Sequence, residues 1–166
     1  MCAALTRDSR VPESQTAPVV RHMDWRRDAE AVTGFQVEIY ERNFPGFRVT
    51  PFFLHAYRRD MKRALRSPDE ALYVVEDEGQ AAGFLWIAVI ATMVDARVGY
   101  VKNLYVAPHL RGQGWAQRLL AVADQWFRGQ GVARAELDAS VCNPRAVATY
   151  EEWGYQATRL RMSKDL

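Results

Sequence analysis

A glycine-rich segment in the second half of the chain has the residues of a phosphate-binding turn. It follows an apolar run that predicts a strand, precedes a run with helical spacing, and reads Arg111-Gly112-Gln113-Gly114-Trp115-Ala116. The first amides of a helix lack acceptors within the helix and together carry roughly +0.5 of a charge, so a diphosphate can bind there with little help from side chains. The glycines would let the backbone approach such a ligand. A tight turn without a ligand is the alternative interpretation.

Two other kinds of nucleotide-binding turn are excluded. A dinucleotide-binding turn needs three glycines in the pattern G-x-G-x-x-G after an early strand, and a P-loop needs Gly-Lys followed by Ser or Thr. The segment from 111 to 116 has neither pattern. A phosphate-bearing ligand other than a dinucleotide or a P-loop nucleotide therefore fits the turn better.

Asn143 and Tyr150 form a second pair of residues that could do chemistry. Asn143 precedes Pro144, a favoured first residue of a helix, so the Asn143 side chain could cap that helix. Tyr150 comes seven residues later, about two helical turns, which places both side chains on nearly the same face. A phenol in that position could protonate a leaving group. Alternatively, Tyr150 is a packing residue, as helical tyrosines commonly are.

The two segments together resemble motifs A and B of the GCN5-related N-acetyltransferases, the GNAT superfamily. The motif A core, [Q/R]-x-x-G-x-[G/A], is filled by Arg111, Gly114 and Ala116. The motif B pattern, N-x-x-A-x-x-x-Y-x-x-x-G-[F/Y], is filled by Asn143, Ala146, Tyr150, Gly154 and Tyr155. The resemblance is specific from Val98 to Tyr155, and it extends as a matching order of elements from Val19 to Met162.

This resemblance implies a transferase that moves an acetyl group from acetyl-CoA to a primary amine of a small molecule, or to a peptide or protein amino terminus. It implies that acetyl-CoA lies where two central strands splay apart, with the thioester carbonyl polarised by a backbone amide near Leu104 or Tyr105. Tyr150 would be the catalytic general acid, and Asn143 would bind the pantetheine arm or cap its helix. No metal is expected. The implied acetyl-CoA-binding residues are Leu104, Tyr105, Val106, Arg111, Gly112, Gln113, Gly114, Trp115, Ala116 and Asn143.

One position departs from the family pattern. Many members carry an acid before motif A, in a pattern like E-D-L-Y-V, which accepts the proton of the attacking ammonium, whereas this chain has Lys102 at that position. Glu38, Glu41 and Asp138 are possible substitutes, although surface carboxylates are usually solvated. Lys102 could bind an anionic part of the acceptor or pair with a neighbouring carboxylate, and we favour the pairing.

Several aromatic residues fall in segments that wall the acceptor pocket in this family. If they line that pocket here, they favour an acceptor with an apolar or aromatic part over a polyamine, which would need several carboxylates. Packing in the core is the alternative. These residues are Phe44, Phe47, Phe53, Tyr57 and Tyr100.

The periodicity of the sequence predicts one α+β domain with a mixed sheet, over residues 19–166, after a polar tail over residues 1–18 that we expect to be disordered. The expected order is β-α-α-β-β-β-α-β-α-β. Alternation over 98–106 places Val98, Tyr100, Lys102, Leu104 and Val106 on one face. The predicted strands are 18–23, 72–76, 82–90, 98–106, 133–140 and 155–162, and the predicted helices are 26–42, 51–66, 112–128 and 144–153.

The composition describes an ordinary soluble protein. Of 166 residues, 49% are hydrophobic and 25% charged, and the formal charge is only +2. Basic residues are interspersed with acidic ones, so a nucleic-acid-binding face is not favoured. The longest apolar run, 81–94, is shorter than the ~20 residues that a membrane span needs. Two distant cysteines, Cys2 and Cys142, indicate no disulfide framework and favour a reducing cytoplasm.

Three functional hypotheses follow. The first is an acetyl-CoA-dependent N-acetyltransferase, and the family resemblance is compatible with a homodimer. The second is a non-catalytic, regulatory acyl-CoA-binding module, which the missing acid at Lys102 favours and the presence of Tyr150 disfavours. The third is a nucleic-acid-associated protein that uses its basic second helix, although the mixed charges from Arg58 to Arg66 are also typical of a solvated face.

Overall fold

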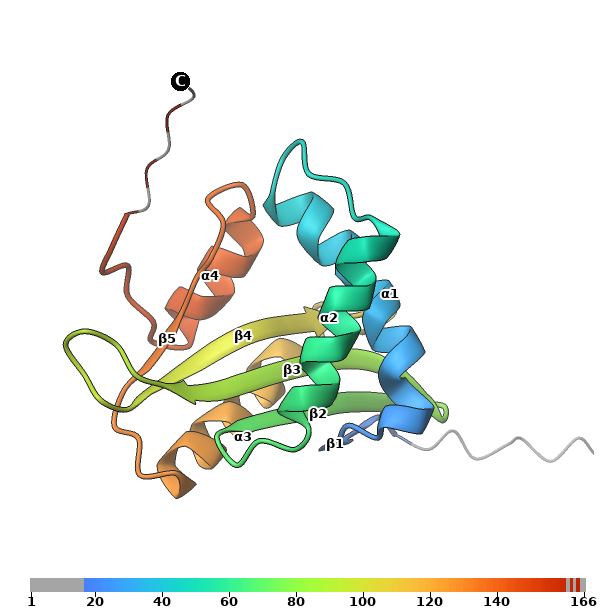
Figure 1. Ribbon diagram of the computed structural model, residues 1–166, viewed down its shortest axis with the longest axis horizontal. Coiled ribbons are helices and arrows are strands. Elements are labelled where there is room, and N and C mark those ends of the chain that lie inside the picture. The colour runs from blue at the N-terminus through green and yellow to red at the C-terminus, as the bar shows by residue number, and fades with distance from the viewer. Residues whose placement is uncertain (1–16, 161, 163, 165–166) are drawn as a thin grey trace, which may run out of the picture.

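A computed structural model describes residues 17–160, 162 and 164, which form one five-stranded sheet with helices on both faces (Figure 1). The strands lie in the order β1-β2-β3-β4-β5; the first four are antiparallel and β5 is parallel to β4. The predicted α+β fold is confirmed. The elements are β1 (Val19–His22), α1 (Trp25–Asn43), α2 (Pro51–Ala64), β2 (Glu70–Asp77), β3 (Gln80–Ile90), β4 (Val98–Val106), η1 (Pro108–Leu110), α3 (Trp115–Gly129), β5 (Ala135–Leu137) and α4 (Pro144–Glu152).

The core has two parts, one on each face of the sheet. On one face, α1 and α2 cover a cluster that contains Val74, Phe84 and Trp86. On the other face, α3 covers a cluster that contains Leu85 and Ile87. Alternate residues of β3 therefore supply both clusters, as the period of a strand requires. Of the predicted tail, only Ala17 and Pro18 belong to the described residues.

Three helices begin at capping residues that the sequence indicates. Asp24 accepts hydrogen bonds from the amides at the start of α1, and Thr50 accepts one from Phe53 at the start of α2. Asn143 accepts one from Ala146 at the start of α4. Such oxygens satisfy amides that have no partner within the helix. Over residues 17–160, no helix is both long and apolar enough to cross a bilayer.

The end of the chain differs from the prediction. Residues 155–160 and 162 form no strand, and β5 spans Ala135–Leu137 where a strand over 133–140 was expected. Alanine-rich segments have little preference for strands, so β5 stays short. A three-residue strand in turn offers few backbone partners to a neighbour, which accounts for the missing sixth strand in the described residues.

Strand β4 has the predicted bounds, but the predicted alternation of its faces is wrong. Trp86 pairs with Asn103 and Ile87 with Val101, so Lys102 has no partner on β3. This irregularity is a β-bulge, which places one extra residue on one strand. Lys102 and Asn103 consequently lie on the face covered by α1 and α2. Beyond the bulge, Leu104 returns to the α3 face that Val101 occupies.

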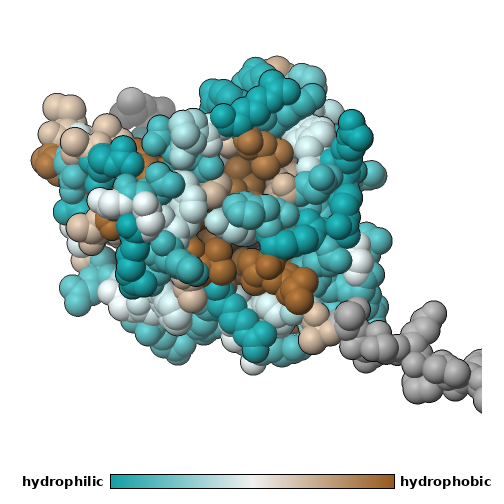
Figure 2. All heavy atoms as spheres, turned by 90° about the horizontal axis from the view of Figure 1, so that it is seen from below, coloured by the Kyte–Doolittle hydropathy of each residue, from teal (hydrophilic) through white to brown (hydrophobic). Residues whose placement is uncertain are grey.

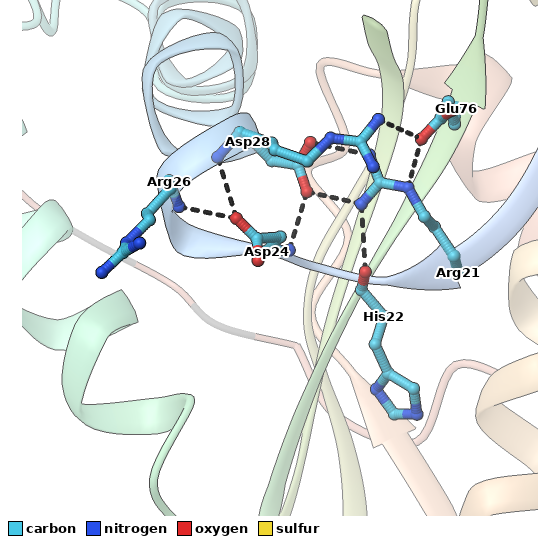
Figure 3. A network of polar contacts seen from close by, with 7 residues as sticks. Arg21, His22, Asp24, Arg26, Asp28 and Glu76 are labelled. Carbon is cyan, nitrogen blue, oxygen red and sulfur yellow. Dashed lines mark hydrogen bonds and ion pairs between the residues drawn. The ribbon is translucent and has the colours of Figure 1, made fainter. Parts of the chain in front are cut away.

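A charge network built around the buried Asp28 holds the start of α1 against the sheet (Figure 3). The guanidinium of Arg21, on β1, donates to both oxygens of Asp28 over 2.6 and 2.9 Å and also bonds Glu76 of β2. Asp28 is only 2% exposed and also accepts a hydrogen bond from the amide of Asp24 over 2.7 Å. Burial alone would raise the pKa of Asp28, but the hydrogen bonds from Arg21 and from the Asp24 amide together lower it.

Arg21→Ala should reduce the free energy of unfolding by about 3–5 kcal/mol, because it leaves Asp28 buried without its cation. Urea denaturation measures the change. The matched control is Arg27→Ala, since Arg27 pairs with Glu76 at a site where its own side chain is 53% exposed; exposed pairs contribute about 1 kcal/mol or less.

The loss of stability in Arg21→Ala should also depend on pH. The pKa of Asp28 is lowered on folding from 3.8, so its charge stabilises the protein above that pH, and the stabilisation is lost as pH falls through the lower folded value. The difference between wild type and Arg21→Ala should therefore be constant near neutral pH and shrink as pH falls, beginning above pH 3.8, because burial without the cation raises the pKa of Asp28 in the variant. A difference that stays the same down to pH 2 would contradict this role of Asp28.

Candidate active site

The site begins where β4 and β5 separate. The two strands pair only from Gly99–Val101 to Ala135–Leu137, and among the described residues no strand pairs with the β5 side of β4 beyond Val101. The bulge at Lys102 lies at this point of separation. In Figure 1 the chain leaves β5, rises away from β4 and turns into α4. The splayed strand pair expected from the resemblance is therefore present.

A cavity of about 280 Å³ lies in this gap, between the second half of β4, the last turns of α1, the start of α3, and α4. Nine of the ten predicted acetyl-CoA-binding residues line it, together with Tyr150. Gln113 is the exception, because its side chain is exposed and donates to the carbonyl of His109 over 2.8 Å. The nine are Leu104, Tyr105, Val106, Arg111, Gly112, Gly114, Trp115, Ala116 and Asn143.

The N-terminus of α3 opens onto this cavity without a cap. The N-cap residue is Gly114, which has no side chain to offer, and the first turn contains no acidic residue. Gly112 and Gly114 both have φ of 78°, a left-handed conformation that other residues adopt at a cost. A Cβ at either position would meet no atom within 4 Å, so conformation and not space requires glycine here. The uncapped amides and the helix dipole make this end attractive to an anion.

The guanidinium of Arg111 supports the wall of the cavity. Its Nε donates to the carbonyl of Val106 over 2.8 Å, and its Nη2 donates to Glu38 over 2.6 Å. Glu38 also accepts from the hydroxyl of Tyr105 over 2.8 Å and pairs with Arg42 over 3.2 Å. Burial would raise the pKa of Glu38, but the hydrogen bonds from Tyr105 and Arg111 lower it below its usual value. This group of residues ties α1 to β4.

The three carboxylates that could replace the missing acid have different surroundings. Glu38 is a weak base, because its lone pairs already accept from cations and a phenol. Glu41 accepts from the amide of Val49 over 3.1 Å and does not line the cavity. Asp138 lines the cavity and accepts a hydrogen bond from the hydroxyl of Tyr100 over 2.7 Å. Asp138 is therefore the best placed of the three to accept a proton in the cavity.

Lys102 pairs with a carboxylate of the neighbouring part of the sheet. Its ammonium lies 3.0 Å from Glu70 and 4.0 Å from the centroid of the Trp86 ring. Glu70 also accepts from the indole N–H of Trp86 over 2.7 Å. The predicted pairing of Lys102 with a neighbouring carboxylate is confirmed, and it fixes the bulge against β2 and β3.

Tyr150 and Asn143 enter the cavity from α4. Burial raises the pKa of the Tyr150 phenol, so the phenol keeps its proton at neutral pH and can donate it. Asn143 caps α4 through Oδ1, and its Nδ2 donates to Oδ1 of Asn43 over 3.1 Å. No local pattern in the sequence singles out Asn43, because 100 positions separate these two residues. Within the described residues no cluster of His, Cys, Asp and Glu could hold a metal ion.

Residues 35–155 match the family described as the acetyltransferase (GNAT) family, and this chain therefore belongs to that family of acetyltransferases. The match spans both segments that the sequence singled out, and it extends back into α1, which supplies one wall of the cavity.

Three known proteins illustrate the relationship. The aminoglycoside N(6')-acetyltransferase type 1 of Serratia marcescens is 26% identical, over 61% of this chain and 73% of that protein. The structure of a predicted acetyltransferase with acetyl-CoA from Clostridium acetobutylicum is 19% identical, with a TM-score of 0.74 over 90% of this chain and 96% of that one. The structure of AAC(6')-Iy in complex with the bisubstrate analog CoA-S-monomethyl-acetylneamine is also 19% identical, with a TM-score of 0.72 over 91% and 99%. At this identity the two structures establish the fold alone.

Gly114→Ala should weaken the binding of acetyl-CoA, the cosubstrate expected from the sequence, by about tenfold. A side chain in the left-handed conformation costs about 1–2 kcal/mol, and relaxing it moves the amides that face the cavity. Isothermal titration calorimetry with acetyl-CoA measures the change. Gly129→Ala, at the other end of the same helix, is the control, because Gly129 has no left-handed conformation and a Cβ there meets no atom within 4 Å. Equal affinity of the two variants for acetyl-CoA would exclude a role of this turn in binding.

Proposed function

We propose that this acetyltransferase moves the acetyl group of acetyl-CoA to a primary amine of a small molecule or of a peptide amino terminus. The observation that carries the proposal is one cavity that combines the uncapped N-terminus of α3, the edge of β4 that pairs with no strand of residues 17–160, and the phenol of Tyr150. These are an anion site, a backbone edge and a proton donor. A pyrophosphate needs the anion site, and the amides of a pantetheine arm need the backbone edge. A thiolate leaving group needs the proton donor.

The fit of acetyl-CoA follows from these elements. Its pyrophosphate would accept hydrogen bonds from the amides of Gln113 to Ala116. Its pantetheine arm would lie along β4 beyond Val101 and add to the sheet like a strand, because that edge has no paired strand in the described residues. A backbone amide near Leu104 or Tyr105 would then stabilise the charge that develops on the thioester oxygen.

The proposed chemistry needs one proton acceptor and one proton donor. Asp138 takes a proton from the substrate ammonium, and the amine nitrogen attacks the thioester carbon. As the new C–N bond forms and the C–S bond breaks, the Tyr150 hydroxyl gives its proton to the departing thiolate. The second proton released by the nitrogen restores the phenol. The products are an N-acetylated amine and CoA, and the proton on Asp138 passes to solvent.

Membership of an acetyltransferase family supports catalysis over the alternative of a non-catalytic acyl-CoA-binding module. A small-molecule acceptor is supported by two of the similar proteins, because the Serratia relative is named for aminoglycosides and the AAC(6')-Iy complex contains CoA-S-monomethyl-acetylneamine. The nucleic-acid alternative has little support, because Asp60 on α2 pairs with Arg59 and Arg63 of its basic face.

Tyr150→Phe should lower kcat by at least about 10²-fold and leave the Kd for acetyl-CoA nearly unchanged, because general acid catalysis contributes 10²–10⁴-fold and the ring itself is retained. Release of CoA thiol over a panel of primary amines measures turnover. The control is Tyr155→Phe. The ring of Tyr155 packs edge-on against that of Tyr150, with 6.0 Å between the ring centroids, but Tyr155 does not line the cavity. An unaltered kcat in Tyr150→Phe would eliminate this residue as the acid.

Asp138→Asn should also reduce kcat/KM by about 10²-fold near neutral pH. Without its base the enzyme depends on amine that is already neutral, so the rate of the variant should rise steadily as pH approaches the pKa of the acceptor amine. A pH profile of thiol release tests this. Glu136→Gln is the matched control, because Glu136 lies two residues earlier and pairs with Arg134. Parallel pH profiles for Asp138→Asn and wild type would exclude Asp138 as the base.

A further inference from the structure

Two carboxamide side chains lie in the core, on the face of the sheet that α1 and α2 cover. Polar residues usually lie at the surface, and on the face in Figure 2 hydrophilic residues surround separate apolar patches. In contrast, Gln36 on α1 is 0% exposed and Asn103 on β4 is 8% exposed. A buried carboxamide destabilises the fold unless it is hydrogen-bonded, so the bonds that these two residues make are important.

The two carboxamides are joined to each other and to the backbone of α1. Nδ2 of Asn103 donates to Oε1 of Gln36 over 3.1 Å, and Nε2 of Gln36 donates to the carbonyl of Val32 over 2.8 Å. Oδ1 of Asn103 is buried and has no hydrogen-bond partner among the described residues. Within the described part of the chain, the Asn103 side chain therefore depends on Gln36 for its hydrogen bond.

This pair lies in the packed core and not in the cavity. Trp86 is the partner of Asn103 on β3, and its ring centroid lies 5.5 Å from that of Tyr57, which is also buried. Neither Gln36 nor Asn103 lines the cavity, so any effect of the pair on the site passes through β4. The aromatic residues considered from the sequence for an acceptor pocket do not line the cavity either; they are Phe44, Phe47, Phe53, Tyr57 and Tyr100.

Contacts at both ends of the second half of β4 require one extra residue there. Val101 pairs with Ile87, and the amide of Ala107 donates to the carbonyl of Ala82 over 2.8 Å. Between these two contacts β4 has one residue more than β3. The extra residue must therefore lie between Val101 and Ala107, and in the structure it is Lys102.

Any later position of the extra residue would turn Asn103 to the other face of the sheet. Asn103 would then lie opposite Leu85, in the cluster that packs against α3. The described residues include four buried polar or charged side chains, of which three belong to α1 and the fourth is Asn103, so none of the others lies on the α3 face. Lys102 would face Trp86 in either arrangement. The hydrogen bond with Gln36 therefore selects the observed position of the bulge.

The position of the bulge also decides which amide of β4 faces the cavity. The amide of Gly99 donates toward β5, to the carbonyl of Arg134 over 2.9 Å, whereas the amide of Ala107 points to β3. Backbone groups of successive residues point to alternate sides of a strand, so beyond the bulge the amide of Leu104 faces the gap. If the extra residue lay later on β4, the amide of Asn103 would face the gap in its place.

We propose that Gln36 is a positioning residue for acetyl transfer, because it holds Asn103 and thereby keeps the bulge where the Leu104 amide faces the thioester oxygen. This inference rests on the proposed function, in which a backbone amide near Leu104 or Tyr105 stabilises that oxygen. It assigns the donor to Leu104, and it gives a catalytic consequence to a buried contact that touches no substrate.

Gln36→Leu removes both hydrogen bonds of this residue and leaves Asn103 unpaired in the core. We expect kcat, measured by thiol release with a primary amine, to fall at least about tenfold, because the complete loss of one donor to a developing oxyanion costs about 10²–10³-fold. The Kd for CoA, measured by calorimetry, should rise less than kcat falls, since the turn proposed to bind the pyrophosphate lies beyond Ala107 and outside the shifted stretch.

The matched control is Thr33→Val. Thr33 is also buried on α1, but its hydroxyl donates to the carbonyl of Ala29 and accepts from Arg58, and it makes no hydrogen bond to β4. Thr33→Val therefore removes buried polar contacts of the same helix without touching the bulge. Its kcat should equal that of the wild type.

A double variant separates positioning from stability. Gln36→Leu combined with Asn103→Leu removes both carboxamides, and replacing both partners of a buried hydrogen bond by apolar groups is nearly neutral for stability. Urea denaturation should therefore show a stability close to that of the wild type. We expect kcat to stay low, because no polar contact then selects the position of the bulge. A purely structural role of Gln36 requires kcat and stability to recover together.

The register can also be measured without activity. In the wild type, NMR should show a nuclear Overhauser contact between the Hα atoms of Leu85 and Leu104, which are partners across β3 and β4. In the single and double variants this contact should pass from Leu104 to the residue at position 103, which is the shift that the loss of the Gln36 bond permits.

Two outcomes would overturn the inference: an unchanged contact between Leu85 and Leu104 in the double variant, or a double variant with the kcat of Thr33→Val. If Gln36→Leu does not fold, the double variant carries both measurements. If no amine is acetylated by the wild type, the proposed function fails, and the NMR contact then decides by itself whether Gln36 sets the register.

Discussion

The separation of β5 from β4 beyond Val101 is the constraint on which the rest of the site depends. Paired strands satisfy each other's backbone groups, so a strand that loses its neighbour presents unpaired groups along one edge. The bulge at Lys102 coincides with this separation, and the contacts of Lys102 with Glu70 and Trp86 keep the extra residue in place. The chain then connects β5 to α4 across the gap, and the cavity with its α1, α3 and α4 walls follows from that single divergence.

The helices differ in what satisfies the amides at their N-termini. The ends of α1, α2 and α4 are closed by Asp24, Thr50 and Asn143, and a cap of this kind contributes about 1 kcal/mol to stability. The N-terminus of α3 lacks that stabilisation, because Gly114 has no side-chain oxygen. A helix end without a cap leaves its amides available to an anion from outside the protein.

Local features were predictable from the sequence, and features set by distant neighbours were not. The bounds of β4, the capping residues and the glycine turn depend on a few adjacent residues, and the structure agrees with them. The bulge at Lys102 breaks the period of two that strand prediction assumes. The prediction of which β4 residues share a face was therefore wrong. The contact between Asn43 and Asn143 joins positions 100 residues apart and leaves no local pattern. Likewise, the choice among Glu38, Glu41 and Asp138 depends on which hydrogen-bond donors the fold places beside each carboxylate.

The hydrogen bond between Asn43 and Asn143 also bears on how the cleft admits a long substrate. Two carboxamides join the walls, so the link carries no net charge, and neither salt nor a change of pH near neutrality loosens it. A pantetheine arm carries amides of the same kind. In the proposed acetyl-CoA complex, such an arm can offer each asparagine a carboxamide partner in place of the other. The α1 and α4 walls of the cleft are therefore joined by one neutral hydrogen bond, unlike the charged contacts of Glu38 that join α1 to β4.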